Sequence, residues 1–252
     1  MIATGTALQG LRPSVRKELL EWWQRRAAIV TFGVVGGLGI VGTLATRIDA
    51  SMGGVPTPAM LAPTANVLGA QFDQWILFAC IFASIGMLAQ ERSNGTLAWT
   101  LSKPVSRASV LLAKWIAAVA VLGVAAVALP LALSVAVATW SYGAVPDIAA
   151  IVAYGLVLLG LPAFFVALNL AVATRINSQA GIAAIAFAVL AVPYFVGGFV
   201  PAVAEVWPTA IGALAGAVAT GSAPNAPTVA GWAIGLVGTG LIGLLVFNRE
   251  DL

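Results

Sequence analysis

The sequence predicts an all-α membrane protein with six transmembrane helices and with both termini on the cytoplasmic side. Of its 252 residues, 61% are hydrophobic and only 8% are charged, whereas soluble domains carry about 25% charged residues. Six apolar runs are long enough to cross a bilayer core, which takes roughly 20 helical residues. These runs do not alternate polar and apolar residues as the strands of a membrane β-barrel do.

The six predicted spans are bounded by charged residues, prolines or glycine-rich segments. They are Ala27 to Thr46, Phe72 to Gln90, Leu111 to Thr139, Ile148 to Thr174, Ala180 to Val200 and Val229 to Phe247. The third, fourth and fifth spans contain Pro130, Pro162 and Pro193, each of which removes a helical hydrogen bond and favours a kink. The alternative is that these prolines are merely tolerated, as proline often is in membrane helices.

Lysine and arginine set the predicted orientation, because basic residues near spans are retained in the cytoplasm. With the N-terminus inside, only Arg47 of the 12 basic residues faces outward. The inner residues are Arg12, Arg16, Lys17, Arg25, Arg26, Arg92, Lys103, Arg107, Lys114, Arg175 and Arg249. We expect a multi-pass plasma (inner) membrane protein, with the first span kept as an anchor because it is too long for a cleaved signal peptide.

Three segments outside the spans belong to what we expect to be a single domain over residues 1–252. Residues 11–26 predict an amphipathic helix on the inner membrane surface, or else a solvated extension of the first span. Residues 47–71 predict an irregular loop because they are rich in glycine and proline. Residues 201–227 are apolar but cut by prolines, which leaves only Thr209 to Ala219 as a short helix. We therefore expect a re-entrant or interfacial outer hairpin there.

Composition excludes several kinds of chemistry. The chain has no histidine and one cysteine, Cys80, so it predicts no catalytic residues, no metal site and no internal disulfide. None of its three lysines follows a glycine, so the Gly-Lys-Ser/Thr of a Walker A loop is absent. The basic residues are spread between spans, which argues against nucleic acid as a partner. Any energy from a nucleotide must come from another chain.

Few polar side chains fall inside the predicted spans. Asp73 lies at the outer end of the second span, and we expect Lys114 to reach back from the third span to the membrane surface. Because no carboxylate is clearly at the midplane, a proton- or sodium-driven carrier is disfavoured. We expect Asn169 to hydrogen-bond a neighbouring helix, and Cys80 to be a buried apolar side chain.

Small residues in the first and last spans predict close helix packing. Glycines four residues apart in the first span, and a ridge of small residues along the sixth, allow backbones to approach. These residues are Gly33, Gly37, Gly231, Gly235, Thr239 and Gly243. We expect contacts within one chain, the alternative being a seam between two chains.

Residues 91–107, between the second and third spans, read E-R-S-N-G-T-L-A-W-T-L-S-K-P-V-S-R. Asn94 and Gly95 can end the second span and Thr96 can cap a new short helix. Lys103 and Pro104 stop that helix. A short helix displayed between two spans is a natural docking surface for a soluble partner.

This loop resembles the corresponding loop of ABC-2 type transporter permeases, in which an acidic-basic pair, Gly-Thr-Leu and Pro-Val-Ser-Arg recur. The matching residues here are Glu91 and Arg92, then residues 95–97 and 104–107. The start of the chain, with Arg16 to Leu19 and Arg25 and Arg26, is similar to that family's start. Six spans with both ends inside, and a re-entrant element before the last span, fit the same fold.

The resemblance implies that residues 96–102 form a coupling helix that rests on a separate ATP-binding subunit, and that residues 11–26 form a connecting helix that also touches it. The implied docking residues of the loop are Glu91, Arg92, Gly95, Thr96, Leu97, Trp99, Leu101, Lys103, Pro104, Ser106 and Arg107. Those of the connecting helix are Arg16, Lys17, Glu18, Trp22, Trp23, Arg25 and Arg26. The alternative for each charge is that it only fixes topology.

Together these features predict a permease subunit without an ATPase site of its own. The expected partners are two ATP-binding subunits, which hold ATP and Mg²⁺, a second permease chain, identical or related, and membrane lipid. The uncharged spans favour outward transport of an amphiphilic or hydrophobic cargo. The alternative is a non-catalytic membrane anchor or substrate-capture subunit that recruits a soluble partner through the same loop.

Overall fold

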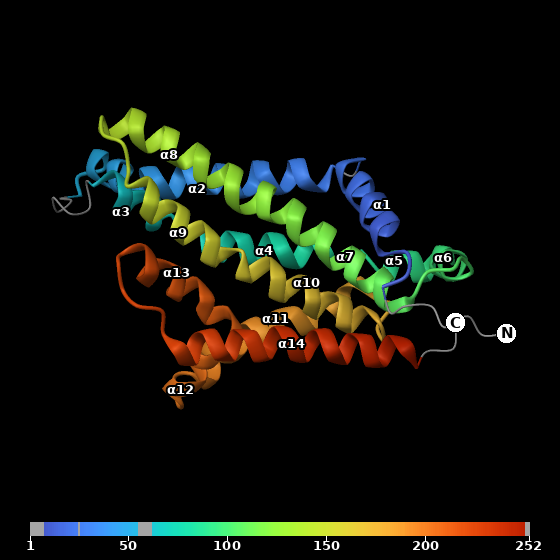
Figure 1. Cartoon of the computed structure of the whole chain (residues 1–252). Coiled ribbons are helices and arrows are strands. Elements are labelled where there is room, and N and C mark those ends of the chain that lie inside the picture. Colours follow the sequence, from blue (N-terminus) through green and yellow to red (C-terminus); the bar gives the residue numbers. More distant parts are fainter. Residues whose placement is uncertain (1–7, 25, 55–61, 250–252) are drawn as a thin grey trace.

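The computed structural model describes residues 8–24, 26–54 and 62–249 (Figure 1). All regular elements in these ranges are helices, and six stretches are long and apolar enough to cross a membrane. These stretches are Ala27–Ser51, Pro63–Ser93, Arg107–Tyr142, Ile148–Ala173, Gln179–Val196 and Ala226–Asn248. The prediction of an all-α fold with six membrane-spanning helices is therefore confirmed, while the orientation of the termini stays a prediction.

The first half of the chain forms two spans and several short helices. The helices are α1 (Leu11–Gln24), α2 (Ala27–Ser51), α3 (Pro63–Leu68), α4 (Phe72–Ser84), α5 (Ala89–Ser93) and α6 (Thr96–Leu101). The prediction of an irregular loop over residues 47–71 is wrong in two places. α2 continues to Ser51, and α3 begins at Pro63, whose fixed φ and missing N–H suit the first turn of a helix. Residues 55–61 lie outside the described ranges.

The second half contains the other four spans. Its helices are α7 (Arg107–Leu122), a π-helical segment (Gly123–Ala128), α8 (Leu129–Tyr142), α9 (Ile148–Leu158), α10 (Gly160–Ala173), α11 (Gln179–Val196), α12 (Pro201–Val206), a 3₁₀ turn (Pro208–Ala210), α13 (Ile211–Ala219) and α14 (Ala226–Asn248). The third span consists of α7, the π segment and α8, and the fourth consists of α9 and α10.

The fourth span is the core of the bundle. α10 packs against α4, α7 and α14, and twelve of its 14 residues are buried. The most apolar window of the fourth span is 72% buried, against 6% for the sixth span. Helices at the outside of a bundle bury only the face that packs on the central helix. α14 therefore presents most of its side chains to lipid or to another chain.

Two of the three prolines inside the spans lie at irregularities of the helix. Pro130 follows the π-helical segment, and Pro162 follows the break between α9 and α10. Each lacks the N–H that would bond four residues back, at Ala126 and Leu158 respectively. Pro193 lies inside α11, which continues to Val196.

The segment between the fifth and sixth spans enters the bundle from the end opposite α1. Ile211 lies directly over Gly160, and Trp232 Nε1 donates a hydrogen bond of 2.9 Å to the Gly160 carbonyl. Gly160 is twelve residues after Ile148, which is about 18 Å of helix and close to half of the bilayer core. α13 then returns along α9. The hairpin therefore runs back along the fourth span, and its depth in a membrane stays a prediction. It contains one helix that the sequence did not predict, α12.

Candidate functional site

The two ends of the bundle differ in charge. α1, α5 and α6 gather at one end, shown on the right of Figure 1, which we call the basic end. α3, α12 and the loop before α14 lie at the other end. We call it the hairpin end after the segment of residues 201–227 between the fifth and sixth spans. Arg47 lies toward the hairpin end, where its guanidinium is 5.2 Å from the ring centre of Tyr142. The described basic residues of the predicted inner segments are at or near the basic end.

The segment between α4 and α7 folds as a pair of short helices, α5 and α6, which we call the helical hairpin. α5 ends at Ser93, and Gly95, directly before α6, has a φ of +71°, a left-handed conformation that glycine adopts without strain. The Thr96 hydroxyl donates to the Glu91 carbonyl at 3.2 Å, which ties the start of α6 back to α5. The short helix expected at residues 96–102 is therefore present as α6.

One side of α6 is anchored and the other is open. Leu97 is buried and Leu101 packs on the core, whereas 65% of Trp99 is exposed. Lys103 Nζ lies 3.6 Å from the centre of the Trp99 ring, a cation–π geometry. Pro104 is exposed, and the Ser106 hydroxyl caps α7 by accepting from the Ser109 N–H at 3.0 Å. The hairpin thus holds an aromatic and a cationic side chain outward on a fixed base.

Two arginines of the predicted docking set bind the ends of spans. Arg92 donates to the carbonyls of Ala173 and Thr174 at the end of α10. Arg107 donates to the carbonyl of Phe247 at 2.8 Å, at the end of α14. Cations are favourable there because the last carbonyls of a helix lack partners and carry a partial negative charge. A role of these arginines in docking stays a prediction.

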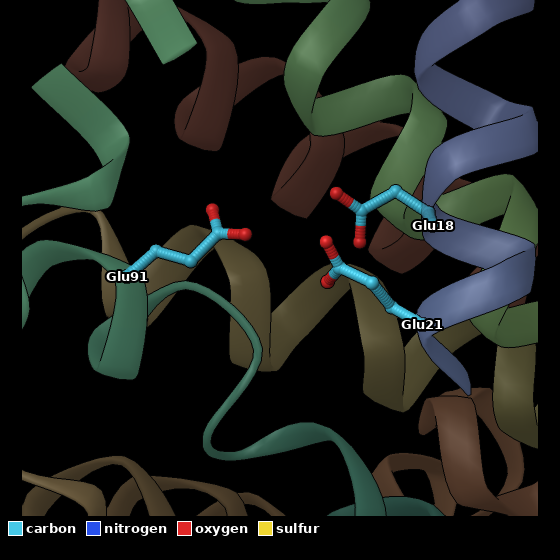
Figure 2. Close-up of side chains that lie close together, drawn as sticks. All are labelled: Glu18, Glu21 and Glu91. Carbon is cyan, nitrogen blue, oxygen red and sulfur yellow. The ribbon is translucent and has the colours of Figure 1, made fainter. Parts of the chain in front are cut away.

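Glu91, the third charge of the predicted docking set, is 8% exposed and belongs to a buried cluster. Figure 2 shows its carboxylate directed toward those of Glu18 and Glu21 on α1. Lys114 of α7 lies between them, with Nζ at 2.8 Å from Glu91 Oε1 and 3.0 Å from Glu18 Oε1. Lys114 was expected to reach the membrane surface, and that expectation is wrong. The residue is 1% exposed, because Glu18 of α1 and Glu91 of α5 lie against its ammonium group.

Lys17 borders the same cluster on its exposed side. Its Nζ lies 3.1 Å from Glu21, 3.6 Å from Glu91 and 3.7 Å from Glu18. Burial acts to lower the pKa of Lys17, but the hydrogen bond with Glu21 and the charges of Glu91, Glu18 and Glu21 outweigh it. The pKa is therefore raised above 10.5, and Lys17 is charged at neutral pH.

The three carboxylates have oxygens within 4.8 Å of one another, a spacing that could hold a metal ion. Two ammonium groups already lie among these oxygens, at 2.8 to 3.7 Å. The arrangement is therefore that of an ion-pair network. Glu91 Oε2 is buried and has no hydrogen-bond donor in the described part of the chain.

α1 packs against α7, and its position on the inner membrane surface stays a prediction. Trp22 is buried, whereas Arg16 and Arg26 are exposed. The start of the helix also touches the end of the loop, since the Ser106 N–H donates to the Gln9 carbonyl at 3.2 Å. Arg25 and the side chain of Trp23 lie outside the described residues. α1 therefore joins the helical hairpin to the third span.

Glycines of the first and last spans behave differently from one another. A Cβ on Gly33 or Gly37 would meet no atom within 4 Å, so these two do not pack within the described chain, contrary to expectation. The close approaches of α2 are made by Gly39 and Gly42 instead. In α14, Gly231, Gly235 and Gly243 contact Val206, Pro208 and Ala171 respectively, and Thr239 bonds back to the Gly235 carbonyl.

The polar and thiol side chains inside the spans have structural surroundings. Asn169 Nδ2 donates to Ser84 Oγ at 2.7 Å and to the Ile81 carbonyl at 3.3 Å, which confirms the expected contact between helices. Cys80 is buried in the apolar core. Asp73 lies in the first turn of α4, next to Gly212 of α13.

These features define a class of protein: a multi-pass helical membrane protein that presents a compact helical hairpin at its basic end. The chain belongs to the ABC-2 family of transporter proteins, because the model of that family matches residues 44–252. No curated protein matches the chain. The family match contains the hairpin and five of the six spans but not α1, whose place in the site rests on its contacts with α5 and α7.

Proposed function

We propose that this chain is the permease subunit of an ABC-2 transporter, and that the ATP-binding subunit docks on the helical hairpin at the basic end. Membership of the family supports a permease. The observation that carries the docking site is the hairpin itself: Leu97 fixes it in the core while Trp99 and Lys103 stay exposed. Exposed aromatic anchors are typical of interface hot spots.

The basic end faces the cytoplasm in this proposal, because basic residues near spans are retained there. α1 and the last turn of α14 lie at that end (Figure 1), so N-in and C-in follow. The sequence lacks a Walker A loop. ATP and Mg²⁺ therefore belong to two partner subunits, one for each of two permease chains.

The cargo is amphiphilic or hydrophobic and moves outward. A groove of about 710 Å³ lies between the third and fourth spans, and all of its lining residues are Ala, Val, Leu, Ile or Gly. This volume is within the range of pockets that hold drug-sized ligands. Both spans are irregular beside the groove, at the π segment and at the break near Leu159.

The test is coexpression with an ATP-binding subunit encoded next to the gene, followed by purification and reconstitution into proteoliposomes. We expect the two chains to copurify and apolar compounds to stimulate ATP hydrolysis. Stimulation by a small ion but by no apolar compound would refute the cargo. A chain that binds the soluble partner without any ATP hydrolysis would be the membrane anchor.

A further inference from the structure

Lys114 is a charged side chain in the apolar part of the third span. It lies seven residues after Arg107, the first residue of α7, which is about 10 Å of helix. Its side chain is 2% exposed, so it does not reach water. An ionisable group at such a position is rare and needs partners.

The partners of Lys114 come from two elements far apart in the sequence. Glu18 belongs to α1 and Glu91 to α5, and both carboxylates lie within 3.0 Å of its Nζ. Lys17 links Glu21 to Glu91 on the exposed side of the same cluster. We call these five residues the ionic joint. It connects α1, α5 and α7 through alternating carboxylate and ammonium groups.

The segments that connect the helical hairpin to the second and third spans are not helical. Residues 85–88, before α5, form a turn, and residues 102–106, after α6, form an irregular segment. Neither link alone would make α7 follow a displacement of the hairpin. The ionic joint supplies a direct connection, because separating it would leave charges buried without partners, which is strongly unfavourable.

The group of helices that the ionic joint connects ends where α7 ends. α7 continues without a break to Leu122, where the π-helical segment begins. Segments of this kind inside a helix are frequent at functional sites, and they mark where a helix can bend. The apolar groove lies beside that segment and beyond it.

We propose that the ionic joint makes α1, the helical hairpin and α7 move as one body, and that Lys114 is the positioning residue through which a displacement of the hairpin reaches the third span. The source of the displacement, an ATP-binding subunit, rests on the proposed function. The joint itself is a property of this chain and can be tested without a partner.

The first experiment measures the distance between spin labels on α1 and α5 in nanodiscs. Leu20 and Ser93 are exposed and lie outside the joint, so both become cysteine, in a background in which the buried Cys80 is alanine. We expect one narrow distance for the native joint and for Lys114→Arg. The triple variant Lys114→Met, Glu18→Gln and Glu91→Gln leaves no unpaired buried charge, so it should fold. We expect its distance distribution to be at least twice as wide.

The second experiment repeats the measurement in the complex with the ATP-binding subunit, without nucleotide and with ATP trapped. With a native joint, the α1–α5 distance should be the same in both states, whereas in the neutral triple variant it should change. A triple variant that keeps the narrow, nucleotide-independent distance overturns the proposal. The proposal is also overturned if the native chain gives a narrow α1–α5 distance only when a divalent cation is added, since the carboxylates would then hold a metal.

The two proposals fail in different ways. If no ATP-binding subunit binds the chain, the proposed function is wrong, and the distances measured in the chain alone still decide whether the joint exists. If the subunit binds but the neutral triple variant behaves like the native chain, only the joint is wrong.

Discussion

The two ends of this bundle are held together by different interactions. At the basic end, long charged side chains connect short helices over pairs such as Lys114 and Glu91. At the hairpin end, backbones touch directly, as where Gly231 lies against Val206 and Gly42 against Ala70. Separating buried ion pairs is strongly unfavourable, and close-packed backbones do not tolerate one added methyl group. The two ends are therefore sensitive to different substitutions, a change of charge at the basic end and an added methyl group at the hairpin end.

The sharpest way to test this difference is to remove one exposed tryptophan from each end. Trp99→Ala, at the basic end, should weaken binding of the ATP-binding subunit about 30-fold, because a central aromatic anchor contributes roughly 2 kcal/mol or more. Trp140→Ala, in α8 toward the hairpin end, should leave binding unchanged although Trp140 is 85% exposed. Fluorescence titration in nanodiscs measures both. Equal effects would mean that the docking surface is not at α6.

A methyl group tests the close packing at the hairpin end. Gly231→Ala would place its Cβ against the Val206 carbonyl, and overpacking of this kind costs about 1–3 kcal/mol. Gly238→Ala is the matched control on the same helix, since its Cβ would meet nothing within 4 Å. We expect a lower thermal unfolding midpoint for the first variant and an equal or higher one for the second. The reverse order would contradict the described packing of α14.

Gly95 tests the shape of the helical hairpin. At a φ of +71°, valine is strained by about 1–2 kcal/mol, while a Cβ there would meet no neighbouring atom. Gly95→Val should therefore impair coupling to the ATP-binding subunit but not membrane insertion, and Gly95→Asn should be tolerated because asparagine adopts this conformation. Stimulated ATP hydrolysis and cell-fractionation assays compare them. Normal hydrolysis in Gly95→Val would show that the hairpin conformation is not needed.

Glu91→Lys is also expected to uncouple transport, but it is a less selective test than Gly95→Val. Glu91 pairs with Lys114 and Lys17, so the substitution would bring three ammonium groups together. It therefore disturbs the ionic joint as well as any contact with a partner.

The smallest effect is expected where a single charge holds the end of a helix. Arg107→Gln should destabilise the last turn of α14 by about 0.3–1 kcal/mol, because it removes a cation from the helix C-terminus. Arg107→Lys keeps the charge and should retain most of this contribution. Hydrogen exchange of the backbone amides near Phe247 measures the difference. Unchanged protection in both variants would show that the bond from Arg107 to the Phe247 carbonyl contributes little.

Hydropathy was sufficient to predict the six spans, and cap, glycine and proline residues predicted the short helix after Gly95 and the hairpin before the last span, because each depends on the local run of residues. The pairing of Lys114 was not predicted, since it depends on where α1 lies in three dimensions. A signal was nevertheless present. A lysine seven residues into an apolar span needs an acidic partner, and Glu18, Glu21 and Glu91 are on the same predicted side of the membrane.

The packing glycines show the same limit. Gly33 and Gly37 form a small-residue pattern in the sequence, yet the neighbouring helices contact the adjacent face of α2, at Gly39 and Gly42. All four glycines are in one helix, and only the rotation of that helix against α4 and α8 decides which of them are covered. The spacing of glycines in the sequence does not predict how the helix is rotated.

The arginines that hold the ends of α10 and α14 come before their acceptors along the chain. Arg92 precedes its acceptor at Thr174, and Arg107 precedes its acceptor at Phe247. Chains are made from the N-terminus, so each guanidinium has been synthesised when the carbonyls that it binds leave the ribosome. The donors that hold the ends of the fourth and sixth spans are therefore synthesised before their acceptors.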